Sequence, residues 1–299
     1  MNTNSKSVHY FSAARPHQWI KQLLIILPFI ALGKNINLES FIKLLYVAIV
    51  FSITSSMVYI YNDILDFQND RKDSIKKLRP IANGKIKLET AYRFTKALLI
   101  LNIFLYFSIY LYIKSFIPII LIFLYLVINL GYTKYNLKKN RIIGIGLVGV
   151  GFPLRFALGA EVLNLDFSYW AFVLIYELAL VMMIGKRFQK NWRDTRNENS
   201  SLEMESIFWL LALITVIGFF AATYLSFISY DPVIQSWGGF HFLLIGILPL
   251  LVGLLRYIEL CFTPNSKFEI SEHFFKDRIL IVSGIFYVLL MYAGKFHGQ

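Results

Sequence analysis

The chain has 299 residues, of which 57% are hydrophobic and only 16% are charged, and its formal net charge is +12. This composition is far more apolar than that of an average soluble domain and indicates an integral membrane protein. Its single cysteine, Cys261, excludes an internal disulfide and a cysteine-based metal cage, and the five histidines form no short metal-ligand motif. No early apolar core precedes a small-residue cleavage site, so we expect no cleaved signal peptide.

Apolar stretches of about 20 residues recur along the chain, and each is long enough to cross the roughly 30 Å hydrocarbon core of a bilayer as a helix. A β-barrel would instead show alternating polar and apolar residues. We therefore expect an all-α bundle of about nine transmembrane helices, forming one domain over residues 1–299. The predicted spans are about 18–33, 40–62, 90–112, 115–134, 142–163, 168–186, 206–228, 238–260 and 278–296.

Most of the 30 Lys and Arg residues lie near the N-terminus and in the loops after the second, fourth, sixth and eighth predicted spans. Cytoplasmic loops carry such an excess, so we predict an inner or plasma membrane protein with a cytoplasmic N-terminus and an outside C-terminus. The same distribution explains the positive net charge and argues against nucleic-acid binding, because no basic soluble domain is present. We expect the active site at the cytoplasmic mouth of the bundle, where the longest loops open.

The most unusual stretch, residues 61–86, follows the second span and reads YNDILDFQNDRKDSIKKLRPIANGKI. The spacing of its aspartates places Asp63, Asp66 and Asp70 on one face of a helix that continues out of the span. Carboxylate and amide oxygens suit Mg²⁺, which shares its coordination shell with substrate phosphates. We predict that Asn62 and these three aspartates hold Mg²⁺ and that the aspartates act in catalysis. The alternative is a solvated helix end paired with nearby lysines.

A basic loop follows the acidic residues, and Asp73, Lys77 and Arg79 are its candidate substrate contacts. Arginine forks and lysine point charges hold phosphate oxygens that a metal ion leaves uncovered. The alternative is that the basic residues serve only to fix the membrane topology.

Further charged residues lie in or next to later spans. Arg155 is inside the fifth span between two glycines at four-residue steps, and a charge in a span usually faces the protein interior. We predict that it binds a phosphate, and the alternative is a structural pair with Glu177. Lys186 and Arg187 end the sixth span, where substrate contact and membrane topology explain basic residues equally well.

These motifs resemble the UbiA superfamily of intramembrane prenyltransferases, whose first aspartate-rich motif reads N-D-x-x-D-x-x-x-D. The segment R-P-H-Q-W-I-K, which contains Arg15, Gln18 and Lys21, is similar to decaprenyl-phosphate phosphoribosyltransferases. So are R-P-I-A-N-G from residue 79, L-R-F-A-L-G from residue 154 and G-K-R from residue 185. The resemblance covers essentially the whole chain and implies that Arg15, Gln18 and Lys21 contact substrate, with an interfacial anchor as the alternative.

One departure from the family pattern bears on the substrate. Family members usually carry a second aspartate motif between the fourth and fifth spans, but no acidic residue occurs between Glu89 and Glu161. The stretch offers Tyr132 and Lys134 to a phosphate instead. Prenyl transfer to an aromatic acceptor usually uses two metal-binding motifs, whereas ribose transfer needs one metal-bound diphosphate and a basic pocket for a lipid phosphate.

The resemblance, together with this departure, implies an enzyme that transfers 5-phosphoribose from 5-phosphoribosyl 1-diphosphate to a polyprenyl phosphate such as decaprenyl phosphate, for cell-envelope glycan precursors. Mg²⁺ is the expected cofactor, and membrane lipids surround the chain. We expect Lys77 and Arg79 to hold the donor, and Lys134, Arg155 and Lys186 to orient the lipid phosphate. The alternatives are prenyl transfer to an aromatic or quinone acceptor by the same fold, or a non-catalytic lipid-binding or transport protein.

Overall fold

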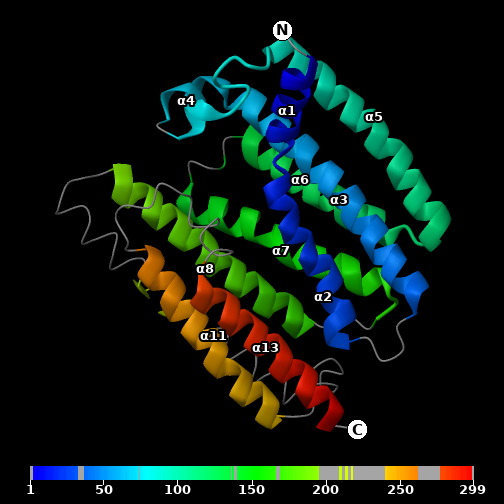
Figure 1. Ribbon diagram of the computed structural model, residues 1–299, viewed down its shortest axis with the longest axis vertical. Coiled ribbons are helices and arrows are strands. Elements are labelled where there is room, and N and C mark those ends of the chain that lie inside the picture. The colour runs from blue at the N-terminus through cyan, green and yellow to red at the C-terminus, as the bar shows by residue number, and fades with distance from the viewer. Residues whose placement is uncertain are drawn as a thin grey trace. The chain divides into compact units, whose positions relative to one another are not determined.

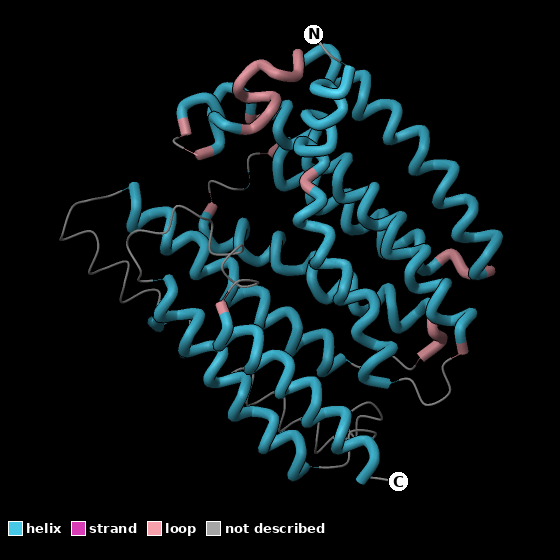
Figure 2. The backbone as a smooth tube through the Cα atoms, in the orientation of Figure 1, coloured by secondary structure: helices cyan, strands magenta, loops and turns pink. Residues whose placement is uncertain are grey.

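The computed structural model describes residues 3–32, 37–73, 75–135, 137, 140–165, 169–194, 240–261 and 277–297, with five more residues between 209 and 217. The described residues form helices and no strands, so the predicted all-α class is confirmed (Figures 1 and 2). The chain divides into two compact units, residues 1–29 with 33–165 and residues 30–32 with 166–299. The single domain expected over 1–299 stays a prediction.

The first unit contains the elements from the N-terminus to residue 165, with α2 included up to residue 29 (Figure 1). In chain order these elements are α1 (Thr3–Ala14), η1 (Pro16–Gln22), α2 (Leu23–Leu32), α3 (Leu38–Leu65), α4 (Phe67–Lys72), η2 (Lys76–Leu78), α5 (Leu88–Ile113), α6 (Ile117–Lys134) and α7 (Arg141–Val162).

Among the described residues, four helical segments are long and apolar enough to cross a membrane. They are Leu38–Leu65, Leu88–Ile113, Ile117–Lys134 and Ile143–Val162, and they match the second to fifth predicted spans. The first predicted span begins in the 3₁₀ helix η1 rather than in an α-helix. The seventh, at 206–228, lies mostly outside the described residues, so the number nine stays a prediction.

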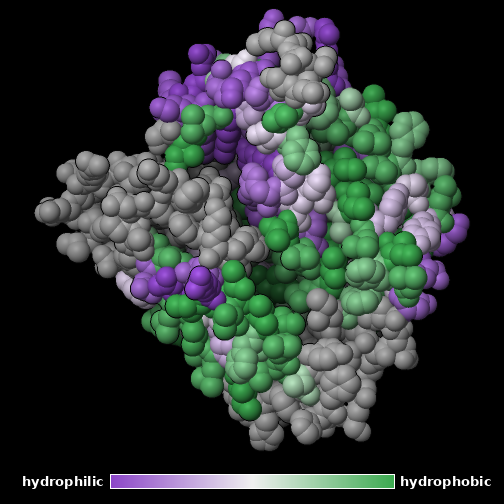
Figure 3. All heavy atoms as spheres, viewed as in Figure 1, coloured by the Kyte–Doolittle hydropathy of each residue, from purple (hydrophilic) through white to green (hydrophobic). Residues whose placement is uncertain are grey.

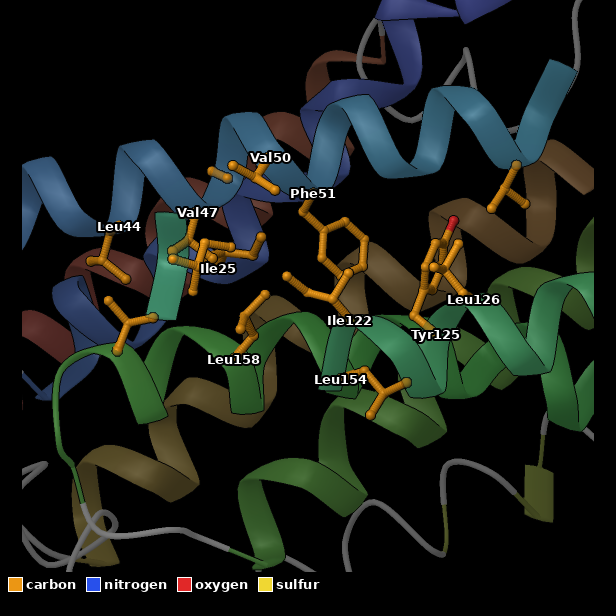
Figure 4. Close-up of a cluster of buried hydrophobic side chains, with 14 of the residues drawn as sticks. Ile25, Leu44, Val47, Val50, Phe51, Ile122, Tyr125, Leu126, Leu154 and Leu158 are labelled. Carbon is orange, nitrogen blue, oxygen red and sulfur yellow. The ribbon is translucent and has the colours of Figure 1, made fainter. Parts of the chain in front are cut away.

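The core of the first unit lies along α3. Its side chains meet those of α6 and α7 in one apolar cluster that includes Leu44, Val47, Phe51, Ile122, Tyr125, Leu154 and Leu158 (Figure 4). Buried residues make up 61% of the most apolar window of α3 but only 11% of that of α5, so α3 is central and α5 peripheral. Hydrophilic side chains gather over α1 and α4, next to a hydrophobic surface over α3 and α5 (Figure 3).

A close contact fixes α2 against α7. A Cβ atom added to Gly159 would lie 2.0 Å from the carbonyl oxygen of Ile25, so only glycine permits this approach of the two backbones. Because Ile25 lies three residues after Gln22, the contact also holds the end of η1 near the C-terminal part of α7.

The second unit contains α8 (Tyr169–Asp194), α11 (Phe240–Cys261) and α13 (Arg278–His297). Gly185 of α8 packs against α11, since an added Cβ would lie 2.6 Å from Sγ of Cys261. The Tyr257 hydroxyl donates a hydrogen bond to the carbonyl oxygen of Met182 at 2.8 Å. At the start of α13, Asp277 accepts a hydrogen bond from Arg256 of α11 at 2.9 Å. These contacts hold the helices of this unit together.

Candidate active site

The acidic motif lies where α3 ends. α3 stops at Leu65, Asp66 has φ −88° and ψ 3°, and α4 begins at the next residue. The expected continuous helix is therefore interrupted at Asp66, with Asp63 on α3 and Asp70 on α4. The interruption is local, because the backbone N–H of Asp66 bonds to the carbonyl of Asn62 at 2.9 Å and that of Asp70 to Asp66 at 2.8 Å. Asp63 and Asp70 consequently remain neighbours.

Arg79 joins the two buried aspartates. Its Nη1 donates to Oδ1 of Asp63 at 3.1 Å and to Oδ2 of Asp70 at 2.7 Å. Arg15 also pairs with Oδ1 of Asp63, and Nζ of Lys76 lies 3.8 Å from Oδ1 of Asp70. The aspartates are only 3% and 2% exposed, so these three cations neutralise charges that water does not reach. Burial raises the pKa of Asp70 above its ordinary value, although Arg79 and Lys76 oppose the shift.

The loop that presents Arg79 is held in place by hydrogen bonds within the loop and by a glycine turn. Oδ1 of Asp73 accepts hydrogen bonds from the N–H groups of Ile75 and Lys76, each at 3.0 Å. Gly84 has φ +79°, in the left-handed region that glycine adopts without a steric cost. Asp73 thus has a visible structural role, and its predicted contact with substrate stays a prediction. Lys77, on the same loop, is exposed.

Two oxygens of the motif indicate a place for a cation. Oδ1 of Asn62 and Oδ2 of Asp63 are buried and have no hydrogen-bond partner. Unsatisfied buried acceptors are costly, and carboxylate and amide oxygens are ligands that Mg²⁺ takes. No group of three or more His, Cys, Asp and Glu side chains converges on a metal position within the described part of the chain. Arg79 occupies the space between the carboxylates of Asp63 and Asp70. The two oxygens without a partner nevertheless have the chemistry that a divalent ion binds.

A second cationic group lies deeper along α3, around Arg155 of α7. Arg155 is 3% exposed, and its Nε donates to Oε1 of Gln22 at 2.6 Å. A second nitrogen donates to the carbonyl oxygen of Gly151. Its guanidinium carbon lies 4.6 Å from the ring centre of Phe51 and 5.0 Å from that of Tyr125, two neighbouring rings whose planes are tilted by 47° (Figure 4). Within the described first unit, no carboxylate pairs with this buried charge.

Two further cations lie close to this group. Nζ of Lys21 is 5.7 Å from the ring centre of Phe152, and the Arg155 guanidinium is 6.0 Å from the same ring. The Arg15 guanidinium, already paired with an aspartate, lies 5.2 Å from the ring centre of Tyr59. The structure therefore brings Arg15, Lys21 and Arg155 into one region, although 133 residues separate Gln22 from Arg155.

The sequence did not predict several residues of this region, among them Gln22, Tyr59 and Phe152. One local signal was available for Tyr59, which precedes Asp63 by four residues and so shares its helix face. Gln22 is a buried polar residue whose Nε2 also donates to Oγ of Ser55 at 3.3 Å. Its position at the start of an apolar run did not reveal that partner.

For most of the remaining predicted substrate residues, the structure gives a position and a degree of exposure. Gln18 is half-buried in η1, Tyr132 is half-buried on α6, and Lys134 is exposed at the end of α6. Lys186 is half-buried on α8, which continues to Asp194 and therefore does not end at the predicted boundary. The side chain of Arg187 lies outside the described residues. Substrate contact by these residues stays a prediction, and so does the pairing of Arg155 with Glu177 of the second unit.

Comparison with known proteins identifies the family. Residues 23–275 match the model of the UbiA prenyltransferase family. The chain belongs to this family. It is 28% identical over 255 residues to the decaprenyl-phosphate phosphoribosyltransferase of Corynebacterium glutamicum, an alignment that covers 82% of this chain and 74% of the relative.

Two further comparisons concern other members and the fold. The chain is 29% identical over 167 residues to the digeranylgeranylglyceryl phosphate synthase of Methanocaldococcus jannaschii, covering 56% of this chain and 55% of the relative. A solved UbiA homolog from Archaeoglobus fulgidus, bound to GPP and Mg²⁺, has a TM-score of 0.64 at 16% identity and covers 97% of this chain and 99% of its own. The protein is thus a multi-pass membrane transferase with the UbiA fold.

Proposed function

We propose that this protein transfers 5-phosphoribose from 5-phosphoribosyl 1-diphosphate to a polyprenyl phosphate. The observation that carries the proposal is the presence of two distinct cationic regions in the first unit. One surrounds the aspartates Asp63 and Asp70, and the other surrounds Arg155 without a carboxylate. A reaction between a metal-bound diphosphate and a lipid phosphate monoester needs both kinds of region. The decaprenyl-phosphate phosphoribosyltransferase of Corynebacterium glutamicum supports the same transferred group and the same class of acceptor.

The acidic region would bind the donor. Asn62, Asp63, Asp66 and Asp70 would hold Mg²⁺, which when bound supplies positive charge to the diphosphate leaving group. Arg79 and Lys77 would contact the phosphate oxygens of the donor. Arg79 already lies within hydrogen-bonding distance of both buried aspartates, so its guanidinium has only a short way to move.

The region around Arg155 would bind the acceptor. A phosphate monoester is already an anion near neutral pH, so the reaction needs no general base. Its oxygen would attack the anomeric carbon from the face opposite the diphosphate, forming a C–O bond as the bond to the diphosphate breaks. Lys134 and Lys186 remain candidates for the same phosphate. Catalysis would consist mainly of positioning and charge stabilisation.

The topology completes the proposal. The excess of basic residues in alternate loops favours an orientation in which the N-terminus and the acidic motif face the cytoplasm at the plasma membrane. A water-soluble sugar donor is then accessible to Asp63 from the cytoplasm, and the lipid tail remains in the bilayer. The product would serve in the synthesis of cell-envelope glycans.

A second candidate function is prenyl transfer to an aromatic or quinone acceptor. It is favoured by the fold shared with a UbiA homolog that was solved with GPP and Mg²⁺. Against it stands the absence of any acidic residue between Glu89 and Glu161, where a second aspartate motif is expected.

A direct assay separates these two functions. The purified protein is incubated with Mg²⁺, labelled 5-phosphoribosyl 1-diphosphate and decaprenyl phosphate, and in parallel with a labelled prenyl diphosphate and 4-hydroxybenzoate. We expect label in the lipid of the first reaction and none in the aromatic product of the second. Label only in the prenylated aromatic compound would reject the proposal.

A further inference from the structure

Tyr59 occupies a position between the two cationic regions. It follows Ser55 and precedes Asp63 by one helical turn each, so the three side chains share one face of α3. Four residues correspond to about 6 Å along a helix, which places Tyr59 deeper in the span than the acidic motif. Ser55 is bonded to Gln22, and Asp63 is bonded to Arg15. The face of α3 around Tyr59 therefore connects the two regions.

Three cations act on the phenol of Tyr59, two from η1 and its N-cap and one from α7. The Arg15 guanidinium lies 5.2 Å from the centre of its ring. Lys21 of η1 and Arg155 of α7 are close enough to act electrostatically on its hydroxyl group. The hydroxyl also interacts with that of Tyr125, whose ring lies beneath Arg155. Tyr59 is thus the point on which these segments converge.

A neutral phenol does not offset this concentration of positive charge. Arg155 is buried, and its described contacts are an amide oxygen, a carbonyl oxygen and aromatic rings, all of them uncharged. Like charges in a poorly hydrated interior repel one another more strongly than in water. An anion bound among them relieves that repulsion, and a tyrosine hydroxyl has one proton to donate to such an anion.

We propose that Tyr59 is a substrate-binding residue that donates a hydrogen bond to the phosphate of the lipid acceptor. The chemical class of the ligand is a phosphate monoester of a long-chain alcohol. Tyr59 lies within a helix that is long and apolar enough to cross the membrane, so a phosphate attached to a lipid tail in the bilayer is the kind of anion suited to this position. The inference rests on the proposed function, because it assigns a residue to the acceptor of that reaction.

Binding of farnesyl phosphate, a short polyprenyl phosphate, tests the assignment without donor or Mg²⁺. The detergent-purified protein is titrated with farnesyl phosphate, and we expect Tyr59→Phe to raise the dissociation constant about tenfold. Tyr106→Phe is the matched control, because the Tyr106 hydroxyl bonds to Thr54 at 2.9 Å in a different buried network. This control is expected to bind like the wild type. Farnesol, which lacks the phosphate, is expected to bind the wild type and Tyr59→Phe equally.

Each outcome has a clear meaning once thermal unfolding shows that the variants are folded. Unchanged binding by Tyr59→Phe, or an equal loss in Tyr106→Phe, would overturn the assignment. A further measurement separates it from the proposed function. If the wild type binds farnesyl phosphate through Tyr59 but transfers no ribose, the proposed function is wrong and the assignment of Tyr59 to phosphate binding is supported. If ribose is transferred and Tyr59→Phe leaves the KM for the lipid unchanged, the proposed function is supported and only the assignment of Tyr59 is wrong.

Discussion

The acidic region and the Arg155 region both bury charge at the same helix, but they neutralise it differently. Asp63 and Asp70 are paired with arginine and lysine side chains of the protein itself. Among the described residues of its unit, the side chains and carbonyl groups that bond to or stack on Arg155 are neutral. A region that neutralises its own charges must exchange partners when a ligand binds, whereas a region with an excess of one charge is already prepared for a ligand of the opposite sign.

This contrast assigns different roles to two arginines. A divalent ion that takes the oxygens of Asp63 and Asp70 leaves the guanidinium of Arg79 available to phosphate oxygens. Arg155 pairs with no carboxylate of the described first unit, so an anion can bind it there without breaking an ion pair. The following predictions test the contrast, from the largest expected effect to the smallest.

Asp63→Asn is the most direct test of metal binding by the acidic region. The change keeps the shape of the side chain but removes a buried charge that two guanidinium groups contact. We expect ribose transfer to fall by about 10³-fold, the scale of losing a major electrostatic contribution to catalysis. Binding of Mn²⁺, followed by electron paramagnetic resonance, should also weaken. Glu39→Gln, at the other end of α3, is the control because Glu39 is exposed and pairs with Lys43 one helical turn away. Normal Mn²⁺ binding by Asp63→Asn would contradict the metal site.

Arg79→Gln tests the partner exchange. Without Arg79 the buried carboxylates of Asp63 and Asp70 lose their shared cation, and breaking a buried pair in this way typically costs about 3–5 kcal/mol. We expect a lower Tm in the presence of a chelator and a partial recovery when Mg²⁺ is added. Arg93→Gln removes an exposed arginine paired with Glu89, a change worth about 0–1 kcal/mol. If Mg²⁺ stabilises the wild type and Arg79→Gln equally, the exchange of partners is wrong.

Arg155→Met tests the region with surplus positive charge, and here the expected changes in stability and activity have opposite signs. An apolar side chain of similar length removes the desolvation cost of a charge that pairs with no carboxylate of the described first unit, and this gain offsets the lost hydrogen bonds to Gln22 and Gly151. We expect an unchanged or higher Tm, together with a fall of about 100-fold in kcat/KM for the polyprenyl phosphate. The KM for 5-phosphoribosyl 1-diphosphate should change little. A lower Tm with normal lipid kinetics would show that Arg155 is structural.

The helices and the acidic motif were predictable because both are local features of the sequence. Apolar runs of sufficient length predicted α3, α5, α6 and α7, and the aspartate spacing predicted the site next to the end of α3. The interruption at Asp66 was not predictable, since the spacing of charges carries no information about one residue's backbone angles. The bridge from Arg79 to Asp63 and Asp70 depends on how a loop folds back, which composition does not determine.

The surroundings of Arg155 were not predictable for a different reason. Its partners come from η1, α3 and α6, and no periodic pattern relates Gln22, Phe51 or Tyr125 to position 155. The glycine four residues after Arg155 was visible in the sequence, and small residues indicate close helix packing. Which helix approaches there became clear only from the contact with Ile25.

Gly159→Ala tests whether that contact supports the site. The new methyl group would collide with the carbonyl oxygen of Ile25, a backbone atom that cannot rotate away. We expect a loss of about 1–3 kcal/mol in the free energy of unfolding, as for other overpacked interiors. Because Ile25 and Gln22 lie on adjoining turns, the Gln22–Arg155 hydrogen bond should also weaken, which raises the KM for the lipid more than that for the donor. Gly131→Ala is the control, since its nearest neighbour would be 4.0 Å away. Equal behaviour of the two variants would show that α7 positions Arg155 without help from α2.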